Sequence, residues 1–418
     1  MPNAEVISIG DELTSGQSLD TNTQWLSQRL GELGIWVVYH TTVGDHLPAV
    51  VDVFRTAIGR ADVVVATGGL GPTDDDLTRE ALAATVDRPL VCDESALEHI
   101  RWLFARRGRE MPEQNQRQAM LPEGSRLVTN PHGTAPGIAL EIPRQDASPV
   151  RVYSLPGVPA EMRQMWEQTL AEELRPLAGD RVILTRAVKV FGAGESAVEA
   201  KLPGLIRRGR HPRVGITASE ATITLRVAAE GATESECLAA MEPTLATIHE
   251  QLGELVYGYD DDQLEDVAVR LLQERGKTLA TVEWASGGTL AERLQSVADA
   301  GPVTLGGMVI GSQTALAGLL DGPDRQFSNK AAASAALAEA MALAVRRRFN
   351  TDYGLAVGPF PETDGPDETP GQVAYAVATE EGAKSIHLPS ASHPALRNTF
   401  CAKTALAVLR RVLLDLPD

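Results

Sequence analysis

Short apolar runs alternate with helix-period segments along the first 170 or so residues, and this alternation constrains the fold more than any other feature. The run at 62–67 (DVVVAT) is almost continuously apolar, which is typical of a strand buried on both faces of a parallel sheet. Leu26, Leu30 and Leu33 recur at helical spacing until Gly34 ends the segment. Repeated strand and helix units predict an α/β fold with a doubly wound parallel sheet. We expect strands at 6–9, 35–39, 62–67, 137–140 and 150–155, and a closing helix from about residue 160.

Two further regions follow. Residues from about 176 to 254 predict a small α+β module that includes helices at 195–206 and 234–252. From about residue 264 the pattern predicts an αβα domain with a strand at 279–282, and the segment 359–370, rich in Pro, Asp, Glu and Gly, predicts a loop. A chain of 418 residues is expected to hold two or three domains. We therefore expect domains at 1–174, 175–257 and 258–418.

The composition disfavours several classes of protein. A formal net charge of −18 disfavours direct binding to nucleic acid or to an anionic membrane. Cys92, Cys237 and Cys401 are far apart, so neither a disulfide framework nor a CxxC metal site is predicted. No apolar run reaches the roughly 18 residues that a membrane-spanning helix needs. We expect a soluble cytoplasmic protein whose partner is a small molecule.

Two acidic residues follow the first predicted strand, in the sequence Gly10-Asp11-Glu12-Leu13. Ligands of open parallel sheets bind outside the carboxyl ends of the strands, so Asp11 and Glu12 are candidate functional residues. Asp20 and Asn22 lie at the start of the next predicted helix. Residues of these types also cap helices, and the pattern favours a cap and a functional role about equally.

The strongest signal is the glycine-rich turn at 68–78 (GGLGPTDDDLT), which leaves a buried-type strand and enters a helix. Gly68, Gly69 and Gly71 would let backbone N–H groups up to Thr73 close on a phosphate near the helix N-terminus. The turn is neither the dinucleotide fingerprint nor a P-loop, because no Gly-Lys-Ser/Thr follows. Three successive aspartates suit a phosphate site only if a divalent cation bridges them to the phosphate. The alternative, that these acids merely favour the helix dipole, leaves the glycines unexplained.

Two later glycine turns, at 130–137 (NPHGTAPG) and 155–162 (LPGVPAEM), follow other predicted elements. By itself each pattern is also compatible with a simple turn. A lone histidine such as His132 is more often structural than a ligand.

These segments occur in the order and spacing of the CinA family (competence/damage-inducible protein CinA), which the chain resembles over essentially its whole length. The match is strongest over the first 170 or so residues, and Gly192-Ala193-Gly194-Glu195-Ser196 matches the family's middle region. The resemblance implies a molybdopterin-binding fold for the first domain. It also implies divalent-metal-dependent hydrolysis of ADP-ribose, and a homodimer.

The resemblance gives the candidate residues roles. The cation (Mg²⁺, Mn²⁺ or Co²⁺) would bind some of five acids, namely Asp11, Glu12, Asp45, Asp75 and Asp76. Its expected ligands are Asp45, Asp75 and Asp76. A water deprotonated by a carboxylate would attack one phosphorus in line. Which acid is the ligand and which is the base stays open. The expected catalytic group is Asp11, Glu12, Asp75 and Asp76, and the expected substrate-binding residues are Asp20, Asn22, Gly68, Gly69, Gly71, Thr73, Asn130, His132, Gly133 and Gly157.

The last domain resembles the nicotinamide-mononucleotide deamidase domain of the same family, but it departs from the family pattern. Trp284 stands where the family has its serine nucleophile, Gly311 where it has a tyrosine and Leu316 where it has a lysine. Tryptophan cannot attack a carboxamide and leucine cannot take a proton, so this domain is expected to be inactive. Ser286 is either a substitute nucleophile or, more in keeping with its turn, a helix cap. The Ala-rich helix expected at 331–347 is either an oligomer surface or an ordinary core-facing helix.

Two rivals to pyrophosphate hydrolysis remain at this point. The first is a pterin-related adenylyl transferase or hydrolase, because the fold is shared with cofactor synthesis. The second is a nucleotide-binding scaffold without catalysis. The acidic cluster disfavours the scaffold, because binding alone does not need so many carboxylates beside a phosphate-binding turn.

Overall fold

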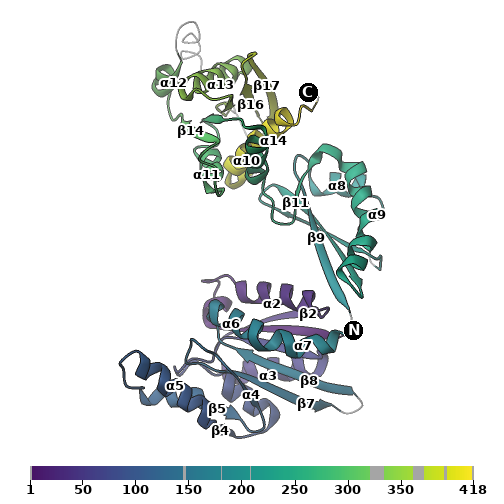
Figure 1. Cartoon of the computed structure of the whole chain (residues 1–418), viewed down its shortest axis with the longest axis vertical. Helices are drawn as coiled ribbons and strands as arrows, with labels where there is room; N and C mark the ends of the chain where they lie inside the picture. The colour runs from purple at the N-terminus through teal and green to yellow at the C-terminus, as the bar shows by residue number, and fades with distance from the viewer. Residues whose placement is uncertain are drawn as a thin grey trace. The chain divides into compact units, whose positions relative to one another are not determined.

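The computed structural model describes residues 2–144, 147–179, 181–207, 209–320, 334–360, 371–389 and 393–416. It separates into two compact units (Figure 1). Unit 1 comprises Met1–Leu184 and Ala229–Ala240, and unit 2 comprises Thr185–Ala228 and Met241–Asp418. The division between the units therefore passes through the segment expected to form the middle module.

Unit 1 is built on a six-stranded sheet of β1 (Asn3–Ile9), β2 (Trp36–Val43), β3 (Val63–Thr67), β6 (Arg126–Val128), β7 (Gly137–Arg144) and β8 (Ala147–Leu155). The strand order is β2-β1-β3-β8-β7-β6. The first four strands in this order are parallel, which confirms the predicted doubly wound α/β fold. The expectation of a wholly parallel sheet is wrong for β7 and β6, which are antiparallel to their neighbours. Too few residues separate β7 from β8 for a crossover helix, so the two strands form a hairpin.

Helices cover both faces of this sheet (Figure 1). Val63 and Val65 of β3 pack on one face and Val64 packs on the other, which explains the unbroken apolar run. One face carries α2 (Thr21–Glu32), α6 (Pro159–Met165), the π-helical turn Trp166–Leu170 and α7 (Ala171–Ala178), and the other carries α3 (Leu47–Arg60) and α4 (Thr78–Val86). The remaining elements are α1 (Asp11–Thr14), the paired strands β4 (Leu90–Cys92) and β5 (Met120–Pro122), α5 (Glu94–Arg106) and the 3-10 helix Glu113–Ala119.

The middle of the chain forms a four-stranded sheet in the order β10-β11-β9-β12. The helix expected at 195–206 is shorter than predicted and ends at Lys201, because Pro203 and Gly204 follow and cannot readily continue a helix. The elements are β9 (Val182–Val190), α8 (Glu195–Lys201), β10 (Arg213–Ser219), β11 (Thr222–Gly231), α9 (Glu234–Leu252), the 3-10 helix Gly253–Leu255 and β12 (Val256–Tyr259).

The last part of unit 2 has a five-stranded sheet in the order β14-β13-β15-β16-β17. Its strands are β13 (Leu279–Glu283), β14 (Thr304–Val309), β15 (Tyr353–Val357), β16 (Gln372–Ala378) and β17 (Ala383–Pro389). One face is covered by α10 (Leu264–Arg275), α11 (Thr289–Ser296) and α14 (Arg397–Leu413), which follows the 3-10 helix Pro394–Leu396, and the other face by α12 (Gln313–Leu319) and α13 (Ala335–Phe349).

The Ala-rich helix corresponds to α13, and residues 331–333 of the prediction lie outside the described residues. Ala338, Met341 and Ala342 are fully buried against the sheet, which confirms the core-facing interpretation, while an oligomer surface on the outer face stays a prediction. Of the loop expected at 359–370, residues 361–370 also lie outside the described part of the chain. Within the described residues, no helix is both long and apolar enough to cross a membrane.

Candidate functional site

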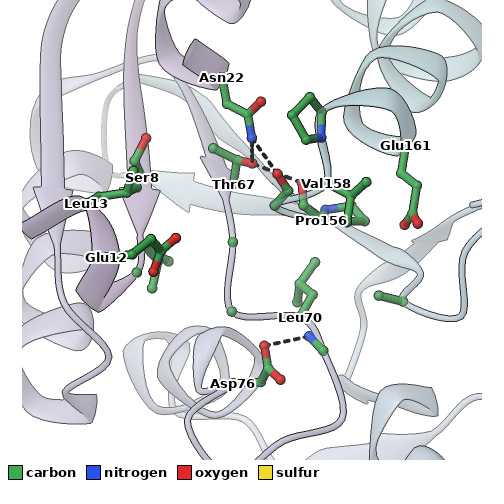
Figure 2. A pocket seen from close by; sticks show the side chains of 18 of the residues that line it. Ser8, Glu12, Leu13, Asn22, Thr67, Leu70, Asp76, Pro156, Val158 and Glu161 are labelled. Atoms are coloured by element: carbon green, nitrogen blue, oxygen red, sulfur yellow. Dashed lines mark hydrogen bonds between the residues drawn. The ribbon is translucent and has the colours of Figure 1, made fainter. Parts of the chain in front are cut away.

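A cavity of about 600 Å³ lies where the parallel strands of unit 1 end (Figure 2). Ser8 and Ile9 at the end of β1, and Thr67 at the end of β3, form part of its wall. The turn after β8 and Asp45 in the loop after β2 also line it. This is the edge of an open α/β sheet at which ligands bind. The predicted site residues that line the cavity are Glu12, Asp20, Asn22, Asp45, Gly68, Gly69, Gly71, Asp75, Asp76 and Gly157.

Hydrogen bonds to its backbone carbonyl groups fix the turn at 68–78. The fully buried Arg79 donates to the carbonyl oxygens of Leu70 at 2.8 Å and Gly71 at 2.7 Å. Thr78 Oγ1 donates to the carbonyl of Gly68 at 2.8 Å. Burial lowers the pKa of Arg79, although the guanidinium stays charged at neutral pH. Because these carbonyls are bonded to the protein, the shape of the turn does not depend on a ligand.

The side chain of Asp76 binds backbone amides of the same turn. Its carboxylate accepts from the amides of Gly71 at 2.7 Å and Thr73 at 2.8 Å, and from Thr73 Oγ1 at 2.5 Å. Two of the backbone donors that the sequence analysis assigned to phosphate are therefore already bonded to a carboxylate. Among the described residues, the amides of Gly69 and Leu70 make no hydrogen bond, and these two remain for an anion. Figure 2 shows Leu70 and Asp76 in the turn that follows Thr67.

The neighbours of Asp76 in the aspartate run face different surroundings. The Asp74 side chain is fully exposed, does not line the cavity and pairs with Arg117 at 3.1 Å. Arg117 also donates to the carbonyl of Thr73 at 2.6 Å, which supports the turn from the 3-10 helix. Asp75 is exposed and lines the cavity. The run precedes α4, which begins at Thr78, so the helix-dipole alternative does not describe it.

Acidic residues from two further loops complete this side of the site. Asp11 and Asp45 each accept a hydrogen bond from the other's amide, at 3.0 Å and 2.9 Å. Burial raises the pKa of Asp45, the Asp11 amide lowers it, and the charges of Asp11, Glu12 and Asp75 raise it further. Asp11 does not line the main cavity but a shallower hollow beside it. The four carboxylates therefore share one electrostatic environment.

Among the residues that the structure describes, six carboxylates line the cavity and no lysine, arginine or histidine does. Carboxylate oxygens are the ligands that a hard divalent cation prefers, so the donor type fits Mg²⁺ or Mn²⁺. Within the described residues, however, no group of three or more His, Cys, Asp or Glu side chains is placed to hold a metal ion. A cation at Glu12, Asp45 or Asp75 would therefore need oxygens from the substrate to complete its coordination.

Asp20 and Asn22 have different roles in the structure. Asp20 is the N-cap of α2: its Oδ1 accepts from the amide of Thr23 at 2.9 Å, and its Oδ2 accepts from Ser8 Oγ at 2.5 Å. The cap interpretation is thus confirmed for Asp20. Asn22 Nδ2 donates to Thr67 Oγ1 at 3.2 Å and to the carbonyl of Gly157 at 2.8 Å, as Figure 2 shows. Asn22 therefore joins the end of β3 to the turn after β8.

Asn130, His132, Gly133 and Thr73 do not belong to the cavity wall. The buried Asn130 binds its own loop: its Oδ1 accepts from Gly133 N at 2.9 Å and its Nδ2 donates to the Ala135 carbonyl at 2.8 Å. His132 is exposed. Through these two hydrogen bonds Asn130 fixes the shape of its own loop.

Glu161 lines the cavity, although the sequence analysis gave it no role. Its Oε2 accepts from Asn130 Nδ2 at 2.7 Å. The signal was present in the sequence, since Glu161 lies in the 155–162 turn, four residues after Gly157. The partnership with Asn130, which is 31 residues away, was not readable from that turn.

Of the residues singled out in the last domain, Ser286, Trp284 and Leu316 lie in or against its core, whereas Gly311 is exposed. Ser286 is fully buried and donates to Glu283 Oε2 at 2.7 Å. Glu283 also accepts from the amides of Leu290 at 3.0 Å and Ala291 at 2.9 Å. The prediction that Ser286 caps the next helix is wrong. Helix α11 begins after Gly288, and its first free amides bind Glu283 instead. Trp284 packs against a core cluster that contains the fully buried Leu316.

Three family models match successive parts of the chain. Residues 5–176 match the family described as "Probable molybdopterin binding domain", residues 185–258 the "Damage-inducible protein CinA KH domain" and residues 261–413 the "CinA C-terminal domain". A competence-damage inducible protein of Symbiobacterium thermophilum is 38% identical over 379 residues, which cover 90% of this chain and 88% of that protein. A CinA-like protein of a Nostoc species is 35% identical and covers 99% of both chains. A crystal structure of the protein CinA from Thermoplasma acidophilum is 34% identical and covers 41% of this chain and 97% of that one, with a TM-score of 0.37.

We expect Asp76→Ala to destabilise the N-terminal domain by about 1–3 kcal/mol, because the Gly71 and Thr73 amides would lose their acceptor. Calorimetry of the full chain would measure the shift of the unfolding transition. Asp74→Ala is the matched control, since its exposed pair with Arg117 is expected to contribute less than about 1 kcal/mol. Equal stability of the two variants would contradict the role given to Asp76.

We expect Asp45→Asn to raise the melting temperature at pH 7, and the gain to vanish as the pH falls toward 4. The folded pKa of Asp45 lies above its ordinary value, so the folded state binds this proton more tightly than the unfolded chain. Wild-type stability is therefore lost as the pH rises through the raised pKa, and asparagine avoids that loss. Asp52→Asn, on the exposed side of α3, is the control. A lower melting temperature for Asp45→Asn at pH 7 would contradict this prediction, because it would show that the fold stabilises the charged carboxylate of Asp45.

Proposed function

The chain belongs to the CinA family, and from this premise we propose that its N-terminal domain hydrolyses a nucleotide pyrophosphate with the aid of a divalent cation. The proposed substrate is ADP-ribose, and the products are AMP and ribose 5-phosphate. One observation carries the proposal: a strand-end cavity has six carboxylates and no basic side chain on its wall, beside a glycine turn with two unbonded amides. The substrate identity comes from the family resemblance.

The charge of the cavity supports a requirement for a cation. The charged side chains around a pyrophosphate beside Glu12, Asp45 and Asp75 would all be negative. Electrostatic repulsion between like charges would therefore oppose binding. A divalent cation binds one or two carboxylates together with phosphate oxygens, so substrate and cation would enter as one neutralised group. The cation supplies charge neutralisation and polarisation of the attacked phosphorus.

The residues of the chain supply the remaining steps. The free amides of Gly69 and Leu70 would donate to phosphate oxygens as negative charge develops on them. Asp75 or Glu12 would accept the proton of the attacking water. The water oxygen bonds to one phosphorus, and the bond from that phosphorus to the bridging oxygen breaks. The bridging oxygen leaves with the other phosphate.

The C-terminal domain, in this proposal, has no deamidase activity. Trp284 and Leu316 lack the chemistry of a nucleophile and a base, and both pack in the core cluster. The hydroxyl of Ser286 is fully buried and donates to Glu283, which also accepts from the amides of α11. A hydroxyl in this position is a structural donor.

Purified full-length protein incubated with ADP-ribose and Mg²⁺, Mn²⁺ or Co²⁺ should release AMP. We expect Asp75→Asn to lower kcat/KM by about 100-fold or more, because it removes a carboxylate from the cavity. The neighbouring Asp74→Asn should retain wild-type activity, since Asp74 faces solvent outside the cavity. Absence of AMP with every metal would overturn the ADP-ribose assignment and favour a pterin ligand or a non-catalytic role. Equal losses in the two variants would remove the assignment to this cavity.

The same preparation should produce no nicotinic acid mononucleotide from nicotinamide mononucleotide, because the last domain lacks a nucleophile and base. Ser286→Ala should leave that null result unchanged and only weaken the contact with Glu283. Deamidation that Ser286→Ala abolishes would contradict the structural role of Ser286.

A further inference from the structure

Glu161 is fixed in the wall of the cavity by a network whose orientation is unambiguous. Asn130 Oδ1 accepts from the backbone amide of Gly133, so its other atom must be the NH₂ group that donates to Ala135 O. The same NH₂ group donates to Glu161 Oε2 at 2.7 Å. One oxygen of Glu161 is thus committed to Asn130, and the other remains an acceptor for a ligand.

Glu161 is separated from the acids assigned to the cation. In Figure 2 it lies on the opposite side of the cavity from Glu12. The charges that raise the pKa of Asp45 come from Asp11, Glu12 and Asp75, and Glu161 is not among them. A carboxylate outside that group repels a phosphate and lacks a positive partner in the wall, so it suits a ligand group that donates hydrogen bonds. Sugar hydroxyls are donors of this kind.

An apolar side chain stands beside Glu161. Val158 lies at the start of α6, one turn before Glu161; it lines the cavity and is 52% exposed. An exposed apolar group next to a hydroxyl acceptor matches the two faces of a nucleoside, whose base is flat and largely apolar and whose ribose carries hydroxyl donors.

We infer that Glu161 accepts a hydrogen bond from a ribose hydroxyl, with Val158 against the nucleoside base, so that the nucleoside end of the substrate lies on the α6 side of the cavity. This inference rests on the proposed function, because it assumes that the ligand is a nucleotide. The pyrophosphate then lies toward Gly69, Asp75 and the acids after β1 and β2. Glu161 acts as a specificity-determining residue, and Asn130 positions it.

Glu161→Gln is a sharp test because of Asn130. Asn130 presents only N–H to residue 161, so glutamine must turn its carbonyl oxygen toward Asn130 and its NH₂ toward the cavity. The substitution replaces an acceptor by a donor with little change in volume. Glu167→Gln is the matched control, since Glu167 lies further along the same helical segment, is exposed and does not line the cavity.

The experiment measures Kd by calorimetry, and KM and kcat by AMP release, for the full chain with Mg²⁺. The ligands are ADP-ribose, its analogue lacking both the 2′- and 3′-hydroxyls of the adenosine, and ADP, which lacks the terminal ribose. We expect Glu161→Gln to weaken ADP-ribose binding by about 10- to 100-fold with kcat nearly preserved. The loss should disappear with the analogue and persist with ADP, which keeps the adenosine hydroxyls. A loss that disappears with ADP instead would place the terminal ribose at Glu161 and overturn the orientation. Glu167→Gln should match the wild type throughout.

Other outcomes separate this inference from the proposed function. Equal losses with all three ligands, or a fall in kcat at unchanged KM, would overturn the hydroxyl assignment and leave the hydrolase proposal standing. Wild-type binding with the expected ligand pattern but without AMP release would overturn the hydrolase proposal alone. Failure of the wild type to bind any of the three ligands would overturn both.

Discussion

The turn after β3 depends on the buried guanidinium of Arg79, and the rest of the candidate site depends on that turn. Arg79 holds the carbonyls of Leu70 and Gly71 toward the protein. A buried charge is costly unless its hydrogen-bonding groups are paired, so this contact restricts the turn to conformations that satisfy it. With the carbonyls turned inward, backbone amides of the same segment become available on the other side. Asp76 then takes two of them and leaves Gly69 and Leu70.

This arrangement assigns different tasks to carboxylates that look alike in the sequence. Asp20 caps a helix, Asp76 closes a turn and Asp74 pairs with Arg117 at the surface. Hydrogen bonds from neutral donors stabilise the carboxylates of the cavity wall but leave their negative charge in place. That charge, and the absence of basic residues in the wall, is the physical reason for linking any phosphate chemistry here to a cation.

The C-terminal domain uses the same interactions for structure. Glu283 is the last residue of the parallel strand β13, and it is fully buried, with its oxygens accepting hydrogen bonds from Ser286 and the first amides of α11. A carboxylate satisfied in this way has no oxygen left for chemistry. At the positions of the family's catalytic groups, Leu316 is buried in a core cluster, Trp284 packs against that cluster and Gly311 is exposed. The domain thus keeps the fold and its strand-to-helix turn without the reactive groups.

The sequence by itself determined the elements and the edge of the sheet at which a site would form. The apolar run of β3, the glycines after it and the helix-period leucines of α2 are local patterns, and local backbone preference and burial decide them. Only the tertiary structure decided which polar groups meet: Asp76 with the amides of its own turn, Asn130 with Glu161, and Ser286 with Glu283. Each of these depends on the direction of a side chain after the backbone has turned, or on residues brought together from distant parts of the chain. A pattern of residue types does not contain those directions, because hydrogen bonds are selected by geometry once the core has packed.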